Sequence, residues 1–389
     1  MIVIVEAVRT AMGGFQGSLS SYTAPDLGAA AIKEVVARSG LQPNEIDEVI
    51  MGCVLPAGLK QGPARQAMRQ AGLPDATGAT TINKICGSGM KAVMQAADAI
   101  KAGSAEFVVA GGMESMSNAP YLMDKARAGF RMGHGKVTDH MFQEGLEDAE
   151  TGLSMGILAQ DMADKKGYTR EQQDQYAIVS LNKAVAAIEG GFFKDEIVPV
   201  VVSSRKGEVT VDQDEQPLNA KVDKIPSLRP AFKKDGTITA ANASSISDGA
   251  SALLVTSSEI AAERGLTPLA NIVAYASHSQ HPSEFTIAPV GAIEKVLKQT
   301  GWNAKEVDLW EINEAFAMVT MAAIDAFDLD TAKVNINGGA CALGHPLGSS
   351  GSRIIVTLIH ALKRTGGKKG IAALCIGGGE ATAIAVELV

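Results

Sequence analysis

Residues 27–52 read LGAAAIKEVVARSGLQPNEIDEVIMG, and residues 288–313 read APVGAIEKVLKQTGWNAKEVDLWEIN. Gly40 aligns with Gly301 and Asp47 aligns with Asp308, both 261 residues apart. The same offset pairs apolar residues spaced i, i+3 and i+4, which is typical of one face of an amphipathic helix. A glycine at the end of such a run favours a helix C-cap. Each segment therefore predicts a helix that ends near a glycine and leads, after an aspartate, into a buried strand.

The similarity between the two segments resumes downstream. AEFVVAGGMES (105–115) resembles GIAALCIGGGEA (370–381), and aligning Gly111-Gly112 with Gly377-Gly378 matches Cys375 with Val109. Each half also predicts a strand, a glycine-rich turn and a helix between these markers. Two halves with the same β-α-β order indicate two similar α/β domains packed against each other. The stretch from about 118 to 245 matches neither half, so we interpret it as an inserted domain.

The composition is that of a globular protein and restricts its partners. The chain has 389 residues, of which 46% are hydrophobic and 20% charged, enough to form a core of full size. The net charge of −8 argues against nucleic acid as a partner. Apolar runs are too short to span a bilayer, and the segment MIVIVEAVRT lacks the basic region of a signal peptide. We therefore expect a cytoplasmic protein with no membrane association.

The four cysteines have to be judged singly. Cys53, Cys86, Cys341 and Cys375 form no CxxC pair, which argues against a zinc site, and four in so long a chain make no disulfide framework. Cys86 lies in NKICGSGMKAV, which predicts a strand-to-helix turn. A helix N-terminus favours the thiolate, so Cys86 is a candidate nucleophile. The alternative is a small buried hydrophobic residue, the usual state of a free cysteine.

Three further candidates lie in the second half. His345 follows a glycine-rich loop in NINGGACALGHPLGSSG and can act as a general base toward a thiol, although a lone loop histidine is often a surface residue. Cys375 ends a predicted strand at the edge where α/β sheets bind ligands. Asn313 follows the strand DLWEI and can hold an oxyanion or a water, or simply cap a helix. If the halves pack as pseudo-twofold partners, these residues meet Cys86 at one site, and the set indicates acyl transfer through a thioester.

Six segments together resemble the thiolase family: NKICGSGMKAV, VAGGMESMS, LRPAFKKDGTITAANASSISDGA, NEAFA, NINGGACALGHPLGSSG and CIGGGEA. They follow one another in order over essentially the whole chain. The resemblance implies the α/β thiolase fold, with duplicated α/β domains in a five-layered αβαβα core and an inserted loop domain. It implies an N-terminal domain of residues 1–117 plus 246–267, a loop domain of residues 118–245 that binds coenzyme A, and a C-terminal domain of residues 268–389.

The resemblance also implies a role for each matched residue. Cys86 would accept the acyl group, His345 would activate it, and Cys375 would exchange a proton with the acetyl-CoA methyl group. Asn313 would hold a water in one oxyanion hole, and the backbone N–H groups of Cys86 and Gly377 would form the other. Coenzyme A would be substrate and product, with no other cofactor and no metal, in a homodimer or homotetramer. Matching positions for the coenzyme A arm are Met155, Phe232, Ser244, Ala315 and Phe316.

The resemblance is strongest to members that join two acetyl-CoA into acetoacetyl-CoA and coenzyme A, or reverse that reaction. The alternative within the family is a degradative 3-ketoacyl-CoA thiolase for longer chains. Ser154 departs from the short-chain pattern, which has His there, and leaves this choice open. Gln216 stands where potassium-responsive members have Tyr, so we expect no required ion. The same fold would also suit a decarboxylating ketoacyl synthase, against which Cys375 argues, or a non-enzymatic scaffold.

Overall fold

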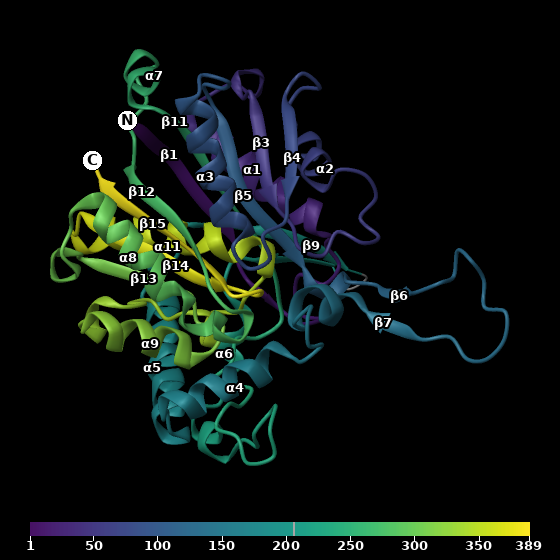
Figure 1. Cartoon of the computed structure of the whole chain (residues 1–389). Helices are drawn as coiled ribbons and strands as arrows, with labels where there is room; N and C mark the ends of the chain where they lie inside the picture. The colour runs from purple at the N-terminus through teal and green to yellow at the C-terminus, as the bar shows by residue number, and fades with distance from the viewer. Residues whose placement is uncertain (205–206) are drawn as a thin grey trace.

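The computed structural model describes residues 1–204 and 207–389, and it is built on a large mixed β-sheet packed with helices (Figure 1). Among the described residues, hydrogen bonds join eleven strands in the order β13-β14-β15-β12-β1-β11-β5-β3-β4, with the short β2 and β8 attached beside this path. The strands are β1 (Ile2–Thr10), β2 (Gly13–Gly14), β3 (Glu48–Gly52), β4 (Gly78–Ile82), β5 (Val108–Ser115), β8 (Ile197–Val198), β11 (Ser247–Ser257), β12 (Ala270–Ser279), β13 (Leu309–Ile312), β14 (Lys369–Ile376) and β15 (Glu380–Leu388).

The two ends of this sheet repeat one pattern. β3 runs parallel to β5, as β13 does to β14. β5 then pairs antiparallel with β11, and β14 pairs antiparallel with β15. β1 and β12 occupy equivalent places beside β11 and β15, and they pair with each other through Ile2 and Ile272, which joins the half-sheets. The predicted duplication is confirmed.

The residues that revealed the repeat make equivalent contacts in both halves. Gly40 and Gly301 take left-handed backbone angles, with φ of 77° and 69°, and end α1 (Ala24–Ser39) and α8 (Ala288–Thr300). The carboxylates of Asp47 and Asp308 each accept two backbone N–H hydrogen bonds from the chain entering β5 and β14. The donors are Glu106 and Phe107 in one half, and Lys368 and Lys369 in the other.

In the downstream part of the repeat, β5 and β14 align with each other four residues away from the alignment predicted from their glycines. Val108 of β5 corresponds to Gly370 of β14, because the two lie opposite equivalent residues of β3 and β13. The offset in this strand is therefore 262, and Cys375 corresponds to Met113 rather than Val109. Cys375 still replaces an apolar residue of the first half.

Helices and half-sheets stack in five layers. α3 (Ser88–Lys101) and α11 (Leu347–Thr365) pack against each other and against both half-sheets, which makes them the central layer. α1 and α2 (Pro63–Gln70) cover the outer face of the first half-sheet. α8 and α9 (Ala317–Phe327) cover the outer face of the second. This arrangement confirms the predicted αβαβα core.

The chain between β5 and β11 makes a long excursion. The hairpin of β6 (Tyr121–Met123) and β7 (Val137–Asp139) carries an arm that projects away from the rest of the chain (Figure 1). Thr169 caps the helix that begins at Arg170, because its hydroxyl accepts the Gln172 N–H. The excursion also contains a π-helix at Phe142–Leu146, α4 (Met155–Lys166), α5 (Arg170–Glu189), β9 (Val200–Ser204), β10 (Gly207–Val211) and α6 (Glu215–Asn219). Two short helices lie later in the chain, α7 (Ser258–Glu263) and α10 (Ala340–Leu343). Within the described ranges, no helix has the length and apolar character needed to cross a membrane.

Gly112 stands where β5 meets α11, with no space for a side chain. A Cβ there would overlap the carbonyl oxygen of Gly348. We predict that Gly112→Ala lowers the free energy of unfolding by about 1–3 kcal/mol, because one of two packed backbones must shift. Denaturant-induced unfolding measures the change. The matched control is Gly78→Ala, whose Cβ would lie 3.5 Å from its nearest neighbour. An unchanged stability in Gly112→Ala would contradict this packing.

Candidate active site

Cys86 lies at the sharp turn from β4 into α3. Ile85, just before it, has a φ of 48°, a strained conformation for a β-branched residue of the kind that gathers at functional sites. Gly87 is the N-cap of α3, and a Cβ on it would overlap the side chain of Ile376 at the end of β14. The thiol is thus held at a helix N-terminus, directly beside the edge of the opposite half-sheet.

His345 is fixed on both sides of its ring. Its Nδ1 lies 2.5 Å from the Oγ of Ser350, and its Nε2 lies 3.5 Å from the Nδ2 of Asn313. The backbone N–H of His345 donates to the carbonyl of Ser245 at 3.2 Å. Burial and the nearby Arg353 cation lower the pKa of His345 to about 3. The imidazole is therefore neutral at physiological pH and has a defined orientation.

Cys375 occupies the end of β14 and is fully buried. Burial, and then the neighbouring Cys86, raise the pKa of the Cys375 thiol well above its ordinary value. Burial raises the pKa of Cys86 to about 11, although the backbone N–H groups of Gly377 and Cys86 favour its thiolate. Both residues are thus protonated thiols in the free protein, and either one needs a base to become a nucleophile.

These residues open on a cavity of about 210 Å³. The first half contributes Cys86 and the second contributes His345 and Cys375, as predicted. Asn313 lies behind His345, is 1% exposed, and is the one predicted site residue outside the lining. The lining includes the other nine predicted residues: Cys86, His345, Cys375, Gly377, Met155, Phe232, Ser244, Ala315 and Phe316.

Part of the cavity wall is an apolar cluster that also packs against Cys375. The rings of Phe232 and Phe285 meet the Phe316 ring edge-on, with centroids 6.1 and 6.3 Å away. Met155 starts α4, and Ser154 caps that helix by accepting the Gly156 N–H at 3.2 Å. Ser154, where the sequence departs from the short-chain pattern, therefore has a local structural role and also lines the cavity.

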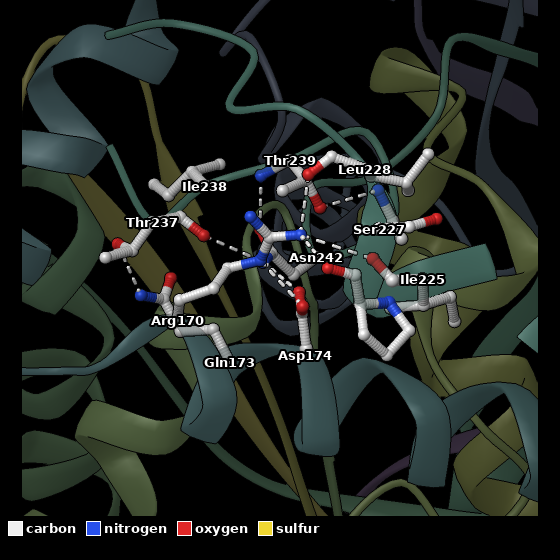
Figure 2. A network of polar contacts seen from close by, with 12 residues as sticks. Arg170, Gln173, Asp174, Ile225, Ser227, Leu228, Thr237, Ile238, Thr239 and Asn242 are labelled. Atoms are coloured by element: carbon white, nitrogen blue, oxygen red, sulfur yellow. Dashed lines mark hydrogen bonds and ion pairs between the residues drawn. The ribbon is translucent and has the colours of Figure 1, made fainter. Parts of the chain in front are cut away.

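A polar network attaches the segment that carries Ser244 to α5 (Figure 2). The Nδ2 of Asn242 donates to Asp174 at 2.8 Å and to the carbonyl of Thr237 at 3.1 Å. Asp174 accepts in turn from the Nε of Arg170 at 2.6 Å. The chain then runs beside the NEAFA segment, where the N–H of Ser244 donates to the carbonyl of Ala315. Hydrogen bonds thus join residues of the excursion between β5 and β11 to residues of the second half at the cavity.

Sequence reasoning missed part of the cavity wall. Leu347 follows His345 by two residues, so its place at the cavity could have been inferred from the chain alone. No periodic pattern marks the π-helix at Phe142–Leu146 or its neighbours, and only folding brings them here. The lining residues that were not predicted are Phe142, Gly145, Leu146, Ser154, Gly156, Ala243, Ile246, Phe285 and Leu347.

A larger groove of about 530 Å³ lies between α5 and α9. Its described lining includes Tyr176, Lys183 and Glu314, but neither a thiol nor an imidazole. The Glu314 carboxylate is already engaged by the Tyr176 and Ser180 hydroxyls at 2.9 and 2.7 Å. Of these two cavities, the smaller one therefore holds the thiols and the imidazole that could react with a substrate.

Two thiols, a neutral imidazole and a side-chain amide around a narrow apolar cavity, on a duplicated αβαβα core, define an acyltransferase site. Family models agree with this class: residues 2–259 match the thiolase N-terminal domain, and residues 266–388 match the thiolase C-terminal domain. The chain belongs to the thiolase family.

Curated relatives match over nearly the full length. The acetyl-CoA acetyltransferase of Pseudomonas aeruginosa is 51% identical over 385 residues, covering 98% of this chain and 98% of the relative. The Escherichia coli acetyl-CoA acetyltransferase is also 51% identical, over 99% of this chain and 98% of the relative.

Solved structures share the whole fold. The acetyl-CoA acetyltransferase of Bacillus anthracis has a TM-score of 0.97 at 43% identity, covering 100% of this chain and 98% of that one. A thiolase from Ascaris suum in complex with coenzyme A has a TM-score of 0.94 at 43% identity, covering 100% of both chains.

Cys86 should be the first cysteine to react with a small alkylating agent. It is partly exposed and lines the cavity, whereas Cys53 and Cys375 are buried. Cys341 is also partly exposed, but burial and the Glu314 carboxylate raise the pKa of its thiol well above the ordinary value. Because only the thiolate reacts, and the pKa of Cys86 is raised to about 11, the rate should rise as the pH increases above neutral. Peptide mass spectrometry after timed iodoacetamide exposure measures this. Faster labelling of another cysteine, or a rate that falls with increasing pH, would contradict the geometry.

Proposed function

We propose that this protein joins two molecules of acetyl-CoA into acetoacetyl-CoA and coenzyme A, and catalyses the reverse thiolysis. The observation that carries the proposal is the convergence of the Cys86 thiol, the His345 imidazole and the Cys375 thiol on one narrow cavity. A covalent acyl donor and a base for carbanion formation are what a Claisen condensation requires. The relatives named acetyl-CoA acetyltransferase support the two-carbon acyl group.

The first half-reaction forms acetyl-Cys86. The Nε2 of His345 takes the Cys86 proton, and the thiolate attacks the thioester carbonyl. The resulting imidazolium donates its Nε2–H to the oxyanion, beside a water held by Asn313. The C–S bond to coenzyme A breaks, and the departing thiolate takes the proton of Cys375. The site then holds an acetyl group, an imidazolium and a Cys375 thiolate.

The second half-reaction forms the carbon–carbon bond. The Cys375 thiolate removes a proton from the methyl group of a second acetyl-CoA, and its raised pKa makes it a strong base. The carbanion attacks the acetyl carbonyl, whose oxygen is stabilised by the backbone N–H groups of Cys86 and Gly377. The Cys86 thiolate leaves and recovers its proton from His345. All groups return to their starting protonation states.

Coenzyme A enters as substrate and leaves as product, and we propose that the loop domain of residues 118–245 holds its arm. Met155, Phe232 and Ser244 approach the cavity from this domain, and Ala315 and Phe316 face them from the second half. We keep the division into residues 1–117 plus 246–267 and residues 268–389 for the other two domains. The return of the chain to the first half-sheet at β11 supports it.

We propose a homodimer or homotetramer in the cytoplasm. The β6–β7 arm projects from the chain and exposes apolar side chains, with Tyr121 at 69% and Met132 at 97% exposure. Exposed apolar groups gathered on one arm favour a protein contact. A reducing compartment suits the chemistry, because Cys86 and Cys375 would have to remain thiols.

The acyl intermediate gives a direct test of the roles. Wild type mixed with acetyl-CoA should carry an acetyl group on Cys86 by peptide mass spectrometry. Cys86→Ala should carry none and lose more than about 10³-fold in kcat, since the nucleophile is gone. Cys375→Ser should still become acetylated while condensation falls by about 10²–10⁴-fold.

The matched control is Cys341→Ala. Its thiol contacts the carbonyl of Glu314 at 3.7 Å and lies outside the cavity, so activity should be retained. Substantial condensation activity in Cys86→Ala would refute the proposed nucleophile.

Chain length separates the proposed substrate from the longer-chain alternative. The narrow cavity and its aromatic wall should favour thiolysis of acetoacetyl-CoA, with kcat/KM falling as the acyl chain lengthens. Steady-state rates over a series of 3-ketoacyl-CoA substrates measure this. A maximum at a longer chain would establish the degradative alternative.

A further inference from the structure

We infer that Ser350 is a positioning residue that fixes the tautomer of His345. Its oxygen accepts the Nδ1 proton of the imidazole, which leaves Nε2 unprotonated and free to act as the base. The inference rests on the proposed role of His345, and it assigns the group that prepares the ring before substrate arrives.

The contacts at Nδ1 set the direction of one hydrogen bond. The Oγ of Ser350 lies 2.5 Å from Nδ1 and also donates to the carbonyl of Pro346 at 2.9 Å, in the first turn of α11. A hydroxyl has a single proton, and a carbonyl oxygen can only accept. With its proton directed at Pro346, the Ser350 oxygen accepts from Nδ1–H.

The contact at Nε2 selects the same tautomer independently. The Nδ2 of Asn313 lies 3.5 Å from Nε2, and an amide nitrogen can only donate. An unprotonated Nε2 accepts from it, whereas the other tautomer would place N–H groups face to face. Both neighbours of His345 therefore favour a proton on Nδ1.

Burial strengthens the preference. Ser350 is 0% exposed, Asn313 1% and His345 5%, so bulk water cannot readily replace either partner. In such surroundings, a hydrogen-bond donor that faces another donor costs more free energy than it would at the surface. The side chain that orients the base thus comes from the same helix whose N-terminus borders the cavity.

One hydrogen bond then serves both states of the catalytic cycle. When Nε2 takes the Cys86 proton, the Nδ1–H bond to Ser350 stays in place. The long contact from the Asn313 amide to Nε2 is given up at this step, and the new Nε2–H can donate to the thioester oxygen in the cavity. The ring changes charge without turning.

Nitrogen NMR tests the assignment directly. The chain has six histidines, and ¹⁵N-histidine labelling with His345→Asn as the assignment control identifies the two ring nitrogens of His345. The free wild-type protein should show a protonated Nδ1 and an unprotonated Nε2 near neutral pH. A protonated Nε2 with a bare Nδ1 overturns the inference, and this result needs no variant of Ser350.

Ser350→Ala should weaken the tautomer preference, because only the long contact from Asn313 would then maintain it, and kcat should fall by about 10–10³-fold with little change in KM. Ser350→Thr, which keeps the hydroxyl, should restore the preference. The matched control is Ser352→Ala, which removes another buried hydroxyl of α11 that bonds Ser251 instead of His345. An unchanged tautomer in a folded Ser350→Ala, or an equal loss in Ser352→Ala, overturns the inference. If His345 keeps its proton on Nδ1 but the protein has no thiolase activity, the proposed function is wrong and the role of Ser350 in setting the tautomer is still supported.

Discussion

The close contact between α3 and α11 determines the rest of this molecule. One helix comes from each half, and a Cβ on Gly89 would overlap Ser352, while a Cβ on Gly351 would overlap the backbone of Met90. Only glycine allows backbones to approach this far. The N-termini of both helices therefore meet between the half-sheets, each with its positive dipole end at the cavity. Cys86 and His345 immediately precede these two helices.

A buried carboxylate strengthens the same junction. Glu114 of β5 accepts the backbone N–H of Gly348 on α11 at 2.8 Å, and also those of Val54 and Leu55 at 2.9 and 3.1 Å. Burial raises the pKa of Glu114 to about 7 against the opposing effect of these bonds. The two thiols and the imidazole of the active site are uncharged in the free protein, so catalysis moves protons between neighbours and creates charge on them only when substrate is present.

Much of this could be predicted from the chain because the repeat is local. Gly40 and Gly301 end helices, and Asp47 and Asp308 fix strand entries, through contacts that short sequence patterns encode. The alignment of the two halves near Cys375 could not be predicted, because glycine-rich segments resemble one another in sequence. The pairing of residues between neighbouring strands is what sets this alignment. The contribution of Phe142–Leu146 to the cavity wall could not be predicted either, since only tertiary packing brings this irregular segment to the cavity.

A crystal structure with coenzyme A tests the account most directly, because the described residues form several cavities and the two thiols meet the imidazole in the one of about 210 Å³. We predict that the coenzyme A sulfur lies between Cys86 and Cys375, with the arm passing Phe232 and Ser244. Coenzyme A bound instead in the larger groove between α5 and α9, with the space between the two thiols unused, would contradict it.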